Sequence, residues 1–229
     1  MTTEEHLENV EGELAQTRQE LADLRAELAV HVRTRFVEVV DENGKTRAVM
    51  RMIGDGPGLV LYDENGNTRA RLDVNQYKYG PVLSLFDENG KVRAMLSGLE
   101  FGASLTLHDD KGEIRALVAA EMDGPRLDLA DENGKIRALL AVDKDRARLD
   151  LADENGKTRA ALGVGKEGTI LGLGDEKGKL RASLVAHKDG PRLEMFDENG
   201  KRRAALGALK HGPAMGLDDE NGNVIWHAP

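Results

Sequence analysis

Apolar and polar residues alternate in short runs along most of the chain, and the runs return at a fixed interval. Residues 126–131, Arg-Leu-Asp-Leu-Ala-Asp, alternate with period two, which predicts a half-buried strand. A few residues later, Arg-Ala-x-Leu-x-Val alternates in the same way. The Asp-Glu-Asn-Gly segment between them predicts a hairpin turn, because Asp bonds to backbone amides ahead of it and Asn and Gly tolerate positive φ.

The motif Asp-Glu-Asn-Gly-Lys-x-Arg-Ala recurs, with variations, nine times. The period is about 22 residues, and internal repetition of this kind decides the fold. The interval between the second and third motifs is longer than the others, which places a two-residue insertion near residues 75–79. A second connection often reads Asp-Gly-Pro, also a turn signal. Each repeat therefore predicts two strands and two turns. The turn glycines are Gly44, Gly66, Gly90, Gly112, Gly134, Gly156, Gly178, Gly200 and Gly222.

Alignment on the turn glycine gives columns of constant chemistry. The residue three before it is always Asp, and the residues three and four after it are Arg and Ala in eight of the nine repeats. The positions seven and five before it and six after it are always apolar. If Glu-Asn-Gly-Lys forms the loop, Leu129 faces Ala138 and Leu127 faces Leu140. The core columns are represented by Ala48, Ala94, Ala138, Leu127, Leu129 and Leu140.

Two all-β folds fit a repeat of two strands, namely an antiparallel meander of hairpins and a parallel solenoid. A solenoid stacks each charged column on itself at about 4.8 Å, where like charges repel by roughly 1 kcal/mol even in water. A meander doubles that spacing to about 10 Å, since another strand intervenes. The charges therefore favour the meander, with the solenoid as the alternative.

A single-layer meander has to cover its apolar face with another layer. The repeats occupy residues 33–229, which leaves no helix for that purpose, and another copy of the chain is the simplest cover. The small Ala column fits a close approach of sheets. The Arg column is expected on the opposite face, where it can form a ladder of charge pairs with the turn aspartates.

Residues 1–32 predict a parallel coiled coil. Thr2 and Glu5 form a capping box, and Glu13 and Glu20 stand at positions g of the heptad, matched by basic e positions at Arg18 and Arg25. The heptad core consists of Leu7, Leu14, Leu21 and Leu28 at a, with Val10, Thr17, Leu24 and His31 at d.

Leucine at a with β-branched residues at d disfavours a dimer. We therefore expect a parallel trimer, with a tetramer as the alternative. A lone amphipathic helix packed on its own domain is the competing interpretation. His31 at a core position is expected to fix the register of the helices, or else to hold an anion or water between them.

Composition narrows the classes of function. The 229-residue chain has a net charge of −9 and no cysteine, which argues against nucleic-acid binding and excludes disulfides and thiolate metal sites. No run of residues is apolar enough for a transmembrane helix, and the acidic N-terminus does not resemble a signal peptide. We therefore expect synthesis in the cytoplasm, with a phage particle or an extracellular filament as possible destinations.

Candidate chemistry is sparse. Asp-x-Asn-Gly matches part of a calcium loop but lacks the further spaced acidic ligands and the final Glu, so a plain turn is favoured, no cofactor is expected, and calcium is the alternative. Tyr77 and Tyr79 lie in the lengthened connector, which is either a ligand-contact loop or an ordinary one. The six histidines share no repeat position. No catalytic motif is present, so we expect no enzyme.

Residues 61–67, Leu-Tyr-Asp-Glu-Asn-Gly-Asn, resemble the YD repeats of the Rhs family, which share a Tyr-Asp-x-x-Gly core and a similar period. The Asn-Gly-Lys hairpins are similar to MORN repeats, without the aromatic and glycine pattern of that family. The plan of a short coiled coil followed by a repetitive β-shaft resembles trimeric fibre proteins, such as phage tail-fibre shafts and stalked adhesins.

The sequence thus predicts an all-β protein of 22-residue hairpin repeats that form a meander or β-prism shaft in an oligomer, after an N-terminal α-helical coiled coil, with itself as its partner. The expected function is a homotrimeric structural shaft, spacer or filament subunit. The alternatives are an adhesin or receptor-binding fibre with repeated surface sites, and a scaffold that tethers a partner through the coil.

Overall fold

The computed structural model describes residues 2–30, 35–74, 80–99 and 102–228, and it divides into a unit of residues 1–37 and a unit of residues 38–229. The first unit contains one helix, α1 (Thr3–Val30). Its first backbone bond runs from the amide of His6 to the carbonyl of Thr2, 3.1 Å. The hydroxyl of Thr17 donates to the carbonyl of Glu13, 2.9 Å, so this polar side chain is satisfied within the helix.

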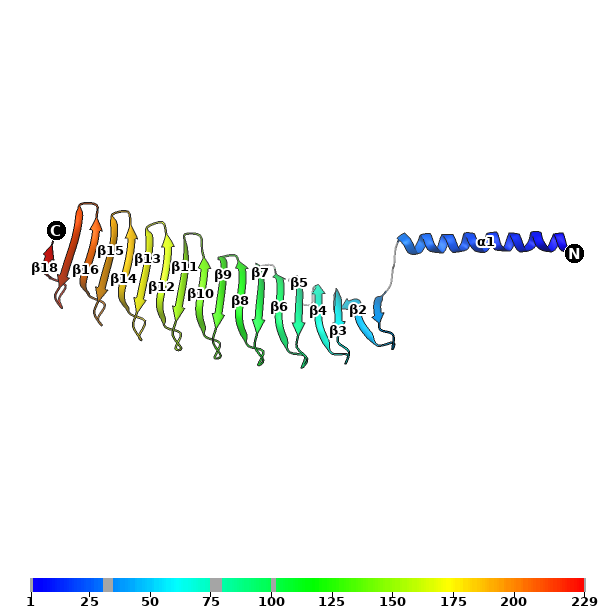
Figure 1. Cartoon of the computed structure of the whole chain (residues 1–229), viewed down its shortest axis with the longest axis horizontal. Helices are drawn as coiled ribbons and strands as arrows, with labels where there is room; N and C mark the ends of the chain where they lie inside the picture. The colour runs from blue at the N-terminus through cyan, green and yellow to red at the C-terminus, as the bar shows by residue number, and fades with distance from the viewer. Residues whose placement is uncertain (1, 31–34, 75–79, 100–101, 229) are drawn as a thin grey trace. The chain divides into compact units, whose positions relative to one another are not determined.

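Eighteen strands make up the sheet, and each pairs antiparallel with the next in the chain (Figure 1). The meander predicted from the charges is therefore confirmed, and the solenoid is wrong. The strands are β1 (Phe36–Val40), β2 (Thr46–Ile53), β3 (Gly56–Tyr62), β4 (Thr68–Val74), β5 (Pro81–Phe86), β6 (Val92–Leu99), β7 (Gly102–His108), β8 (Ile114–Glu121), β9 (Gly124–Ala130), β10 (Ile136–Val142), β11 (Arg146–Ala152), β12 (Thr158–Gly165), β13 (Gly168–Gly174), β14 (Leu180–His187), β15 (Gly190–Phe196), β16 (Arg202–Leu209), β17 (Gly212–Asp218) and β18 (Val224–Ala228).

The predicted cross-strand pairs are confirmed, but the hairpin makes them differently than expected. The amide of Asp131 donates to the carbonyl of Lys135, 2.9 Å, so the loop holds three residues rather than four. Arg137 then forms a β-bulge, because Ile136 pairs with Ala130 and the next pair is Ala138 with Leu129. The bulge adds back the residue that the shorter loop removes, and Leu140 still faces Leu127.

The sheet is one layer thick, and the extensive contacts between strands all join ladder neighbours (Figure 1). Among the described residues, the buried apolar residues are Val60 and Ala119, at 5% and 3% exposure, and no large side chain is fully buried. The described part of the second unit therefore has no hydrophobic core of its own. Hydrogen bonds between strands hold it together, and its apolar face is left uncovered.

Gly134 tests the turn. Its φ is +75°, and a Cβ added there would meet nothing within 4 Å, so the only obstacle to a side chain is the left-handed backbone. We expect Gly134→Ala to destabilise the protein by roughly 1–2 kcal/mol in thermal unfolding, and Gly134→Asn to cost less.

Gly163→Ala is the matched control for this prediction. Gly163 lies within β12, and its added Cβ would make an ordinary contact of 3.5 Å with Cγ2 of Ile170. Its substitution should be neutral or slightly stabilising. Equal destabilisation by the two alanine variants would contradict the turn conformation.

Candidate functional site

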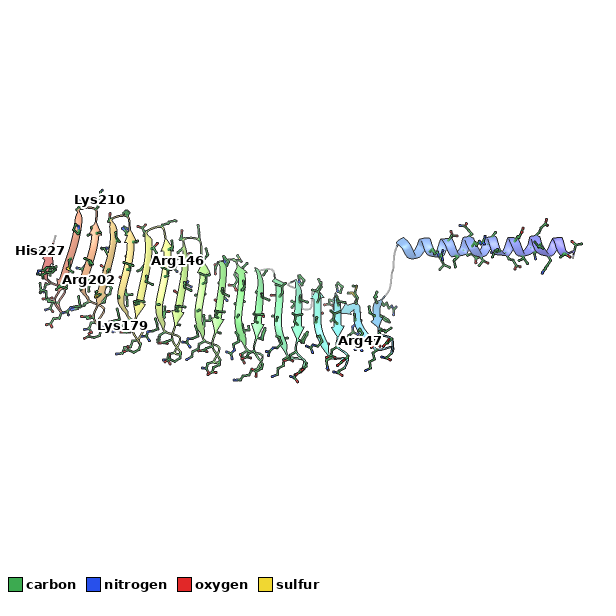
Figure 2. All side chains as sticks on the ribbon, viewed as in Figure 1. Arg47, Arg146, Lys179, Arg202, Lys210 and His227 are labelled. Carbon is green, nitrogen blue, oxygen red and sulfur yellow. The ribbon has the colours of Figure 1, made fainter. Side chains whose placement is uncertain are left out.

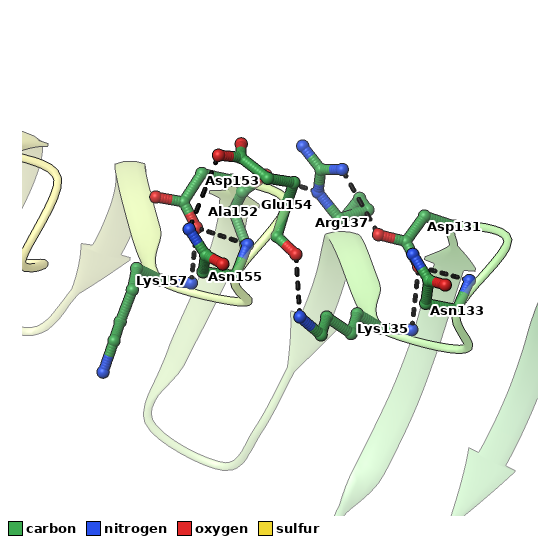
Figure 3. Close-up of polar contacts among 9 residues, drawn as sticks. All are labelled: Asp131, Asn133, Lys135, Arg137, Ala152, Asp153, Glu154, Asn155 and Lys157. Carbon is green, nitrogen blue, oxygen red and sulfur yellow. Dashed lines mark hydrogen bonds and ion pairs between the residues drawn. The ribbon is translucent and has the colours of Figure 1, made fainter.

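Each hairpin turn is organised by its invariant aspartate. In the fifth repeat, Oδ1 of Asp131 accepts hydrogen bonds from the backbone amides of Asn133 and Lys135, at 2.9 and 3.1 Å (Figure 3). The amide of Gly134 donates to the carbonyl of Asp131, 3.0 Å. The same pattern recurs in the other repeats, for example at Asp153. The column of Asp therefore exists because one carboxylate caps two turn amides.

The basic residues after each turn connect it to the following repeat. Nζ of Lys135 donates to the carbonyl of Glu154, 2.9 Å, and Nε of Arg137 donates to the carbonyl of Ala152, 2.8 Å (Figure 3). Glu154 lies in the next hairpin turn, and Ala152 is the last residue of the strand that leads into it. Equivalent lysine bonds link Lys91 to Asp110, Lys179 to Glu198 and Lys201 to Glu220, and equivalent arginine bonds link Arg159 to Gly174 and Arg203 to Asp218.

The arginine also closes its own turn. Nη1 of Arg137 lies 3.3 Å from Oδ2 of Asp131, and Arg159 and Arg181 pair with their own turn aspartates at 3.4 Å. The predicted ladder of charge pairs is thus present, with each arginine projecting from the bulge. We call this set of Asp, Lys and Arg contacts the turn ladder. It follows one long edge of the sheet, where Figure 2 labels Arg47 and Lys179, while Lys210 lies at the opposite edge.

Two repeats depart from the ladder in the same way. Asn67 and Asn223 replace the lysine, and the amide nitrogen of each donates to the aspartate of its own turn, at 3.2 and 3.0 Å. The first of these turns precedes the lengthened interval between repeats. The second belongs to the repeat in which Ile225 stands in the Arg column. Asparagine therefore closes the turn locally where lysine would bridge to another.

The turn aspartates are held as carboxylates. At Asp153, the amide of Lys157 chiefly, then the amide of Asn155 and the Arg159 guanidinium, lower the pKa below its usual value of 3.8, against an opposing effect of desolvation. Asp41 and Asp197 have lowered pKa values with the same leading cause, the amide of the following lysine. Both oxygens of Asp153 are engaged by the chain itself, which leaves little for a cation to bind.

One face of the sheet is apolar throughout. It is built by the positions nine, seven and five before the turn glycine and four, six and eight after it, as the pairs Leu129 with Ala138 and Leu127 with Leu140 show. From β2 to β18, every described residue of this leucine face is uncharged, and the single polar one is Thr169. Its side chains stay half-exposed, with Leu140 at 48% and Leu151 at 45%.

The other face, here the polar face, alternates charged, small and apolar residues. Short side chains are buried there between longer neighbours, for example Ser97, whose hydroxyl lies 2.8 Å from that of Ser104. Asp73 and Asp128 pair with Arg71 and Arg126 two residues away on their own strands, at 2.6 and 3.4 Å. One oxygen of each aspartate is therefore paired within the chain, while Oδ1 of Asp73 and Oδ1 of Asp128 are buried without a hydrogen-bond partner among the described residues.

The predicted coiled-coil residues whose side chains are described lie on one side of α1 and are exposed. Leu7 and Leu24 expose 59% and 57% of their surface, and Val10, Leu14 and Leu21 are also exposed. The side chain of Leu28 and all of His31 lie outside the described residues, as do Tyr77 and Tyr79. Their assigned roles stay predictions.

A metal site and a membrane-spanning helix each set requirements for the described part of the chain. No group of three or more His, Cys, Asp or Glu residues is arranged there to hold a metal ion. The helix in the described residues does not combine the length and the apolar character that crossing a membrane requires.

No protein-family model matches the chain, and no curated protein does. The solved structures that match include the crystal structure of TcdB2-TccC3, with 10% sequence identity and a TM-score of 0.18. The match covers 82% of this chain but 15% of that one. At this TM-score the likeness has no bearing on the fold or the function.

The aspartate turns predict a stability that depends on acid. A carboxyl group whose pKa is lower in the folded state than in the unfolded state stabilises the protein at pH values above the unfolded pKa. This contribution disappears as the pH falls through the folded pKa. We therefore expect the melting temperature to fall below about pH 4, since the unfolded value is 3.8. Melting curves between pH 6 and pH 2.5 measure this, and a flat profile would contradict the capping role of the aspartates.

The turn ladder predicts a specific effect at Arg137. We expect Arg137→Ala to destabilise by about 1 kcal/mol, mainly through the lost bond to the carbonyl of Ala152, because a partly exposed ion pair adds little. Arg137→Lys should not restore stability, since a lysine ammonium lacks the planar guanidinium geometry that reaches the carbonyl of Ala152 and the carboxylate of Asp131 together. Lys144→Ala, at an exposed site in a connector, is the control in thermal unfolding. Equal melting temperatures for Arg137→Ala and this control would show that the turn ladder does not stabilise the protein.

Proposed function

We propose that the chain is a structural protein whose copies assemble into a shaft or spacer, with their leucine faces turned inward and three copies in each shaft. The observation that carries the proposal is the leucine face, which has no charged residue from β2 to β18. The sixteen strand intervals from β2 to β18, at about 4.8 Å each, make it about 77 Å long. Monomeric soluble proteins rarely expose apolar patches of more than a few hundred Å².

The accessible surface supports the same proposal. The chain exposes 16662 Å², whereas a folded monomer of 25.0 kDa exposes about 10,000 Å². Part of the difference belongs to the helix and part to the sheet. Burying the exposed half of one leucine contributes about 1 kcal/mol, and the face repeats such residues on every strand. Assembly therefore offers the stabilisation that a hydrophobic core gives to other folds.

The N-terminal helix supports three copies in parallel. Its leucines stand at the a positions, and Thr17 stands at a d position, where its hydroxyl is already satisfied by the carbonyl of Glu13. A d-position Thr of this kind costs less when buried than one with a free hydroxyl. Acidic g and basic e positions add charge pairs between parallel helices.

A binding fibre is the second candidate. On the polar face, a hollow of about 620 Å³ is lined by Arg148, Asp150, Gly163 and Gly165 among others. In the proposed shaft this face points outward, so hollows of this kind would be accessible. The repeated surface of an adhesin or receptor-binding fibre would use them.

The mass of the particle tests the proposal. We expect sedimentation equilibrium of the full chain to give three times the 25.0 kDa of the single chain. Leu21→Glu should raise the dissociation concentration at least tenfold, because a buried unpaired carboxylate costs several kcal/mol and about 1.4 kcal/mol is a factor of ten.

Gln19→Glu is the matched control, because Gln19 bonds Asp23 on the outer side of the helix and lies away from the heptad core. Its particle should keep the mass and affinity of the parent chain. A folded monomer in the unmodified protein would refute the proposal.

A further inference from the structure

The leucine face consists of three rows of side chains that run along the sheet. On β10 the rows are represented by Ala138, Leu140 and Val142, and on β11 by Leu151, Leu149 and Ala147. We name them the turn row, the middle row and the connector row, in order of distance from the hairpin turn. Since neighbouring strands are in register, each row continues from strand to strand.

The rows differ in the size of their residues. From β2 to β17 the middle row holds Leu, Met or Val on every strand. The turn row alternates, with Ala on each even strand and Leu or Met on each odd one. The connector row holds Pro, Ala or Thr on odd strands and Gly, Ala, Val or Met on even ones. No strand in this range therefore has a leucine at both outer rows.

We propose that three sheets form the sides of a triangular prism, an inference that rests on the proposed shaft. The middle rows lie at the axis of the prism, and the outer rows lie at its corners. The apolar width of a strand is about 20 Å at about 3.3 Å per residue. A prism with sides of about 20 Å places the centre of each side about 6 Å from the axis. That distance is close to half of the roughly 10 Å between packed sheets, so the middle-row leucines fill the axis.

The corners explain the small residues. Where two sides of the triangle meet, the turn row of one copy approaches the connector row of the next, and large side chains in both rows would overlap. A three-fold axis along the shaft puts equivalent strands at one height. On an odd strand Leu151 then meets Ala147 of a neighbouring copy, and on an even strand Ala138 meets Val142. No corner contact in this range thus joins two large residues, since each one contains at least one Ala, Pro or Thr.

Other numbers of sheets fit the rows less well. Two flat sheets keep all rows about 10 Å apart, so the small residue that every strand carries in at least one outer row would leave voids that destabilise the pair. Four sides of about 20 Å place each sheet about 10 Å from the axis, which leaves an open channel beyond the reach of leucine. The size pattern therefore selects three.

Cysteine pairs test the corner contact in a chain that has no cysteine of its own. Residues 138 and 142 lie four apart on one strand, about 13 Å, which is too far for an intrachain disulfide. We expect the full chain carrying Ala138→Cys and Val142→Cys to yield covalent trimers on a denaturing gel after mild oxidation. Each single variant should give no cross-link, because the turn row meets only the connector row.

The control carries Ala130→Cys and Ala141→Cys, which lie on the polar face, and should stay uncrosslinked. The pair Ala160→Cys with Val164→Cys repeats the test one repeat later, in case the first variant fails to fold. Covalent dimers, cross-linking of single variants, or no cross-link in a particle with the mass of three chains would overturn the prism while leaving the shaft intact. A monomeric mass would instead refute the shaft itself.

Discussion

A sheet one layer thick cannot bury a side chain from both directions, and this constraint governs the rest of the molecule. In the repeats, hydrogen bonding and hydrophobic burial are separated. The backbone ladder and the turn contacts are completed within one chain, whereas the leucines remain half-exposed on one face. An isolated sheet in this state is stabilised mainly by its backbone hydrogen bonds. Each of these contributes little net free energy, because the same groups form hydrogen bonds with water in the unfolded chain. Burial of the leucine face is the contribution that the fold lacks.

The turn ladder sets the spacing on which that burial depends. Each aspartate fixes its own loop, and the following lysine and arginine reach backbone carbonyls of the next hairpin, in its turn and at the end of its first strand, as Lys135 and Arg137 do. Because these donors bind backbone rather than a variable side chain, the contact survives differences between repeats. The basic groups also stand between successive turn carboxylates, which offsets the repulsion that favours a meander over a solenoid.

The sequence predicted the strands, the pairs across each hairpin and the meander, because period-two alternation and column charges are local and repeated. It did not predict the bulge. Arg137 was expected to alternate with its neighbours, but a three-residue loop closed by Asp131 and Lys135 shifts the register, and the arginine takes up the shift. A four-residue loop without a bulge and a three-residue loop with a bulge both give the pair of Leu129 with Ala138, so the sequence pattern alone cannot distinguish them. The bonds from Lys135 and Arg137 to the next turn were equally hidden, because their acceptors are carbonyls and carry no side-chain signal.

Repetition creates a problem of register that the proposed coil resolves. Nine near-identical repeats allow copies to align with a slip of one whole repeat, which loses only the contacts of the terminal one, so the sheet itself specifies the alignment weakly. The heptads of α1 are not repeats of one another, since Val10, Thr17 and Leu24 differ at successive d positions. A coil of this kind prefers one alignment, and it holds the sheets at a high effective concentration while they meet. In the proposed shaft the helix therefore determines where the copies start, and the three rows of the leucine face determine how they close.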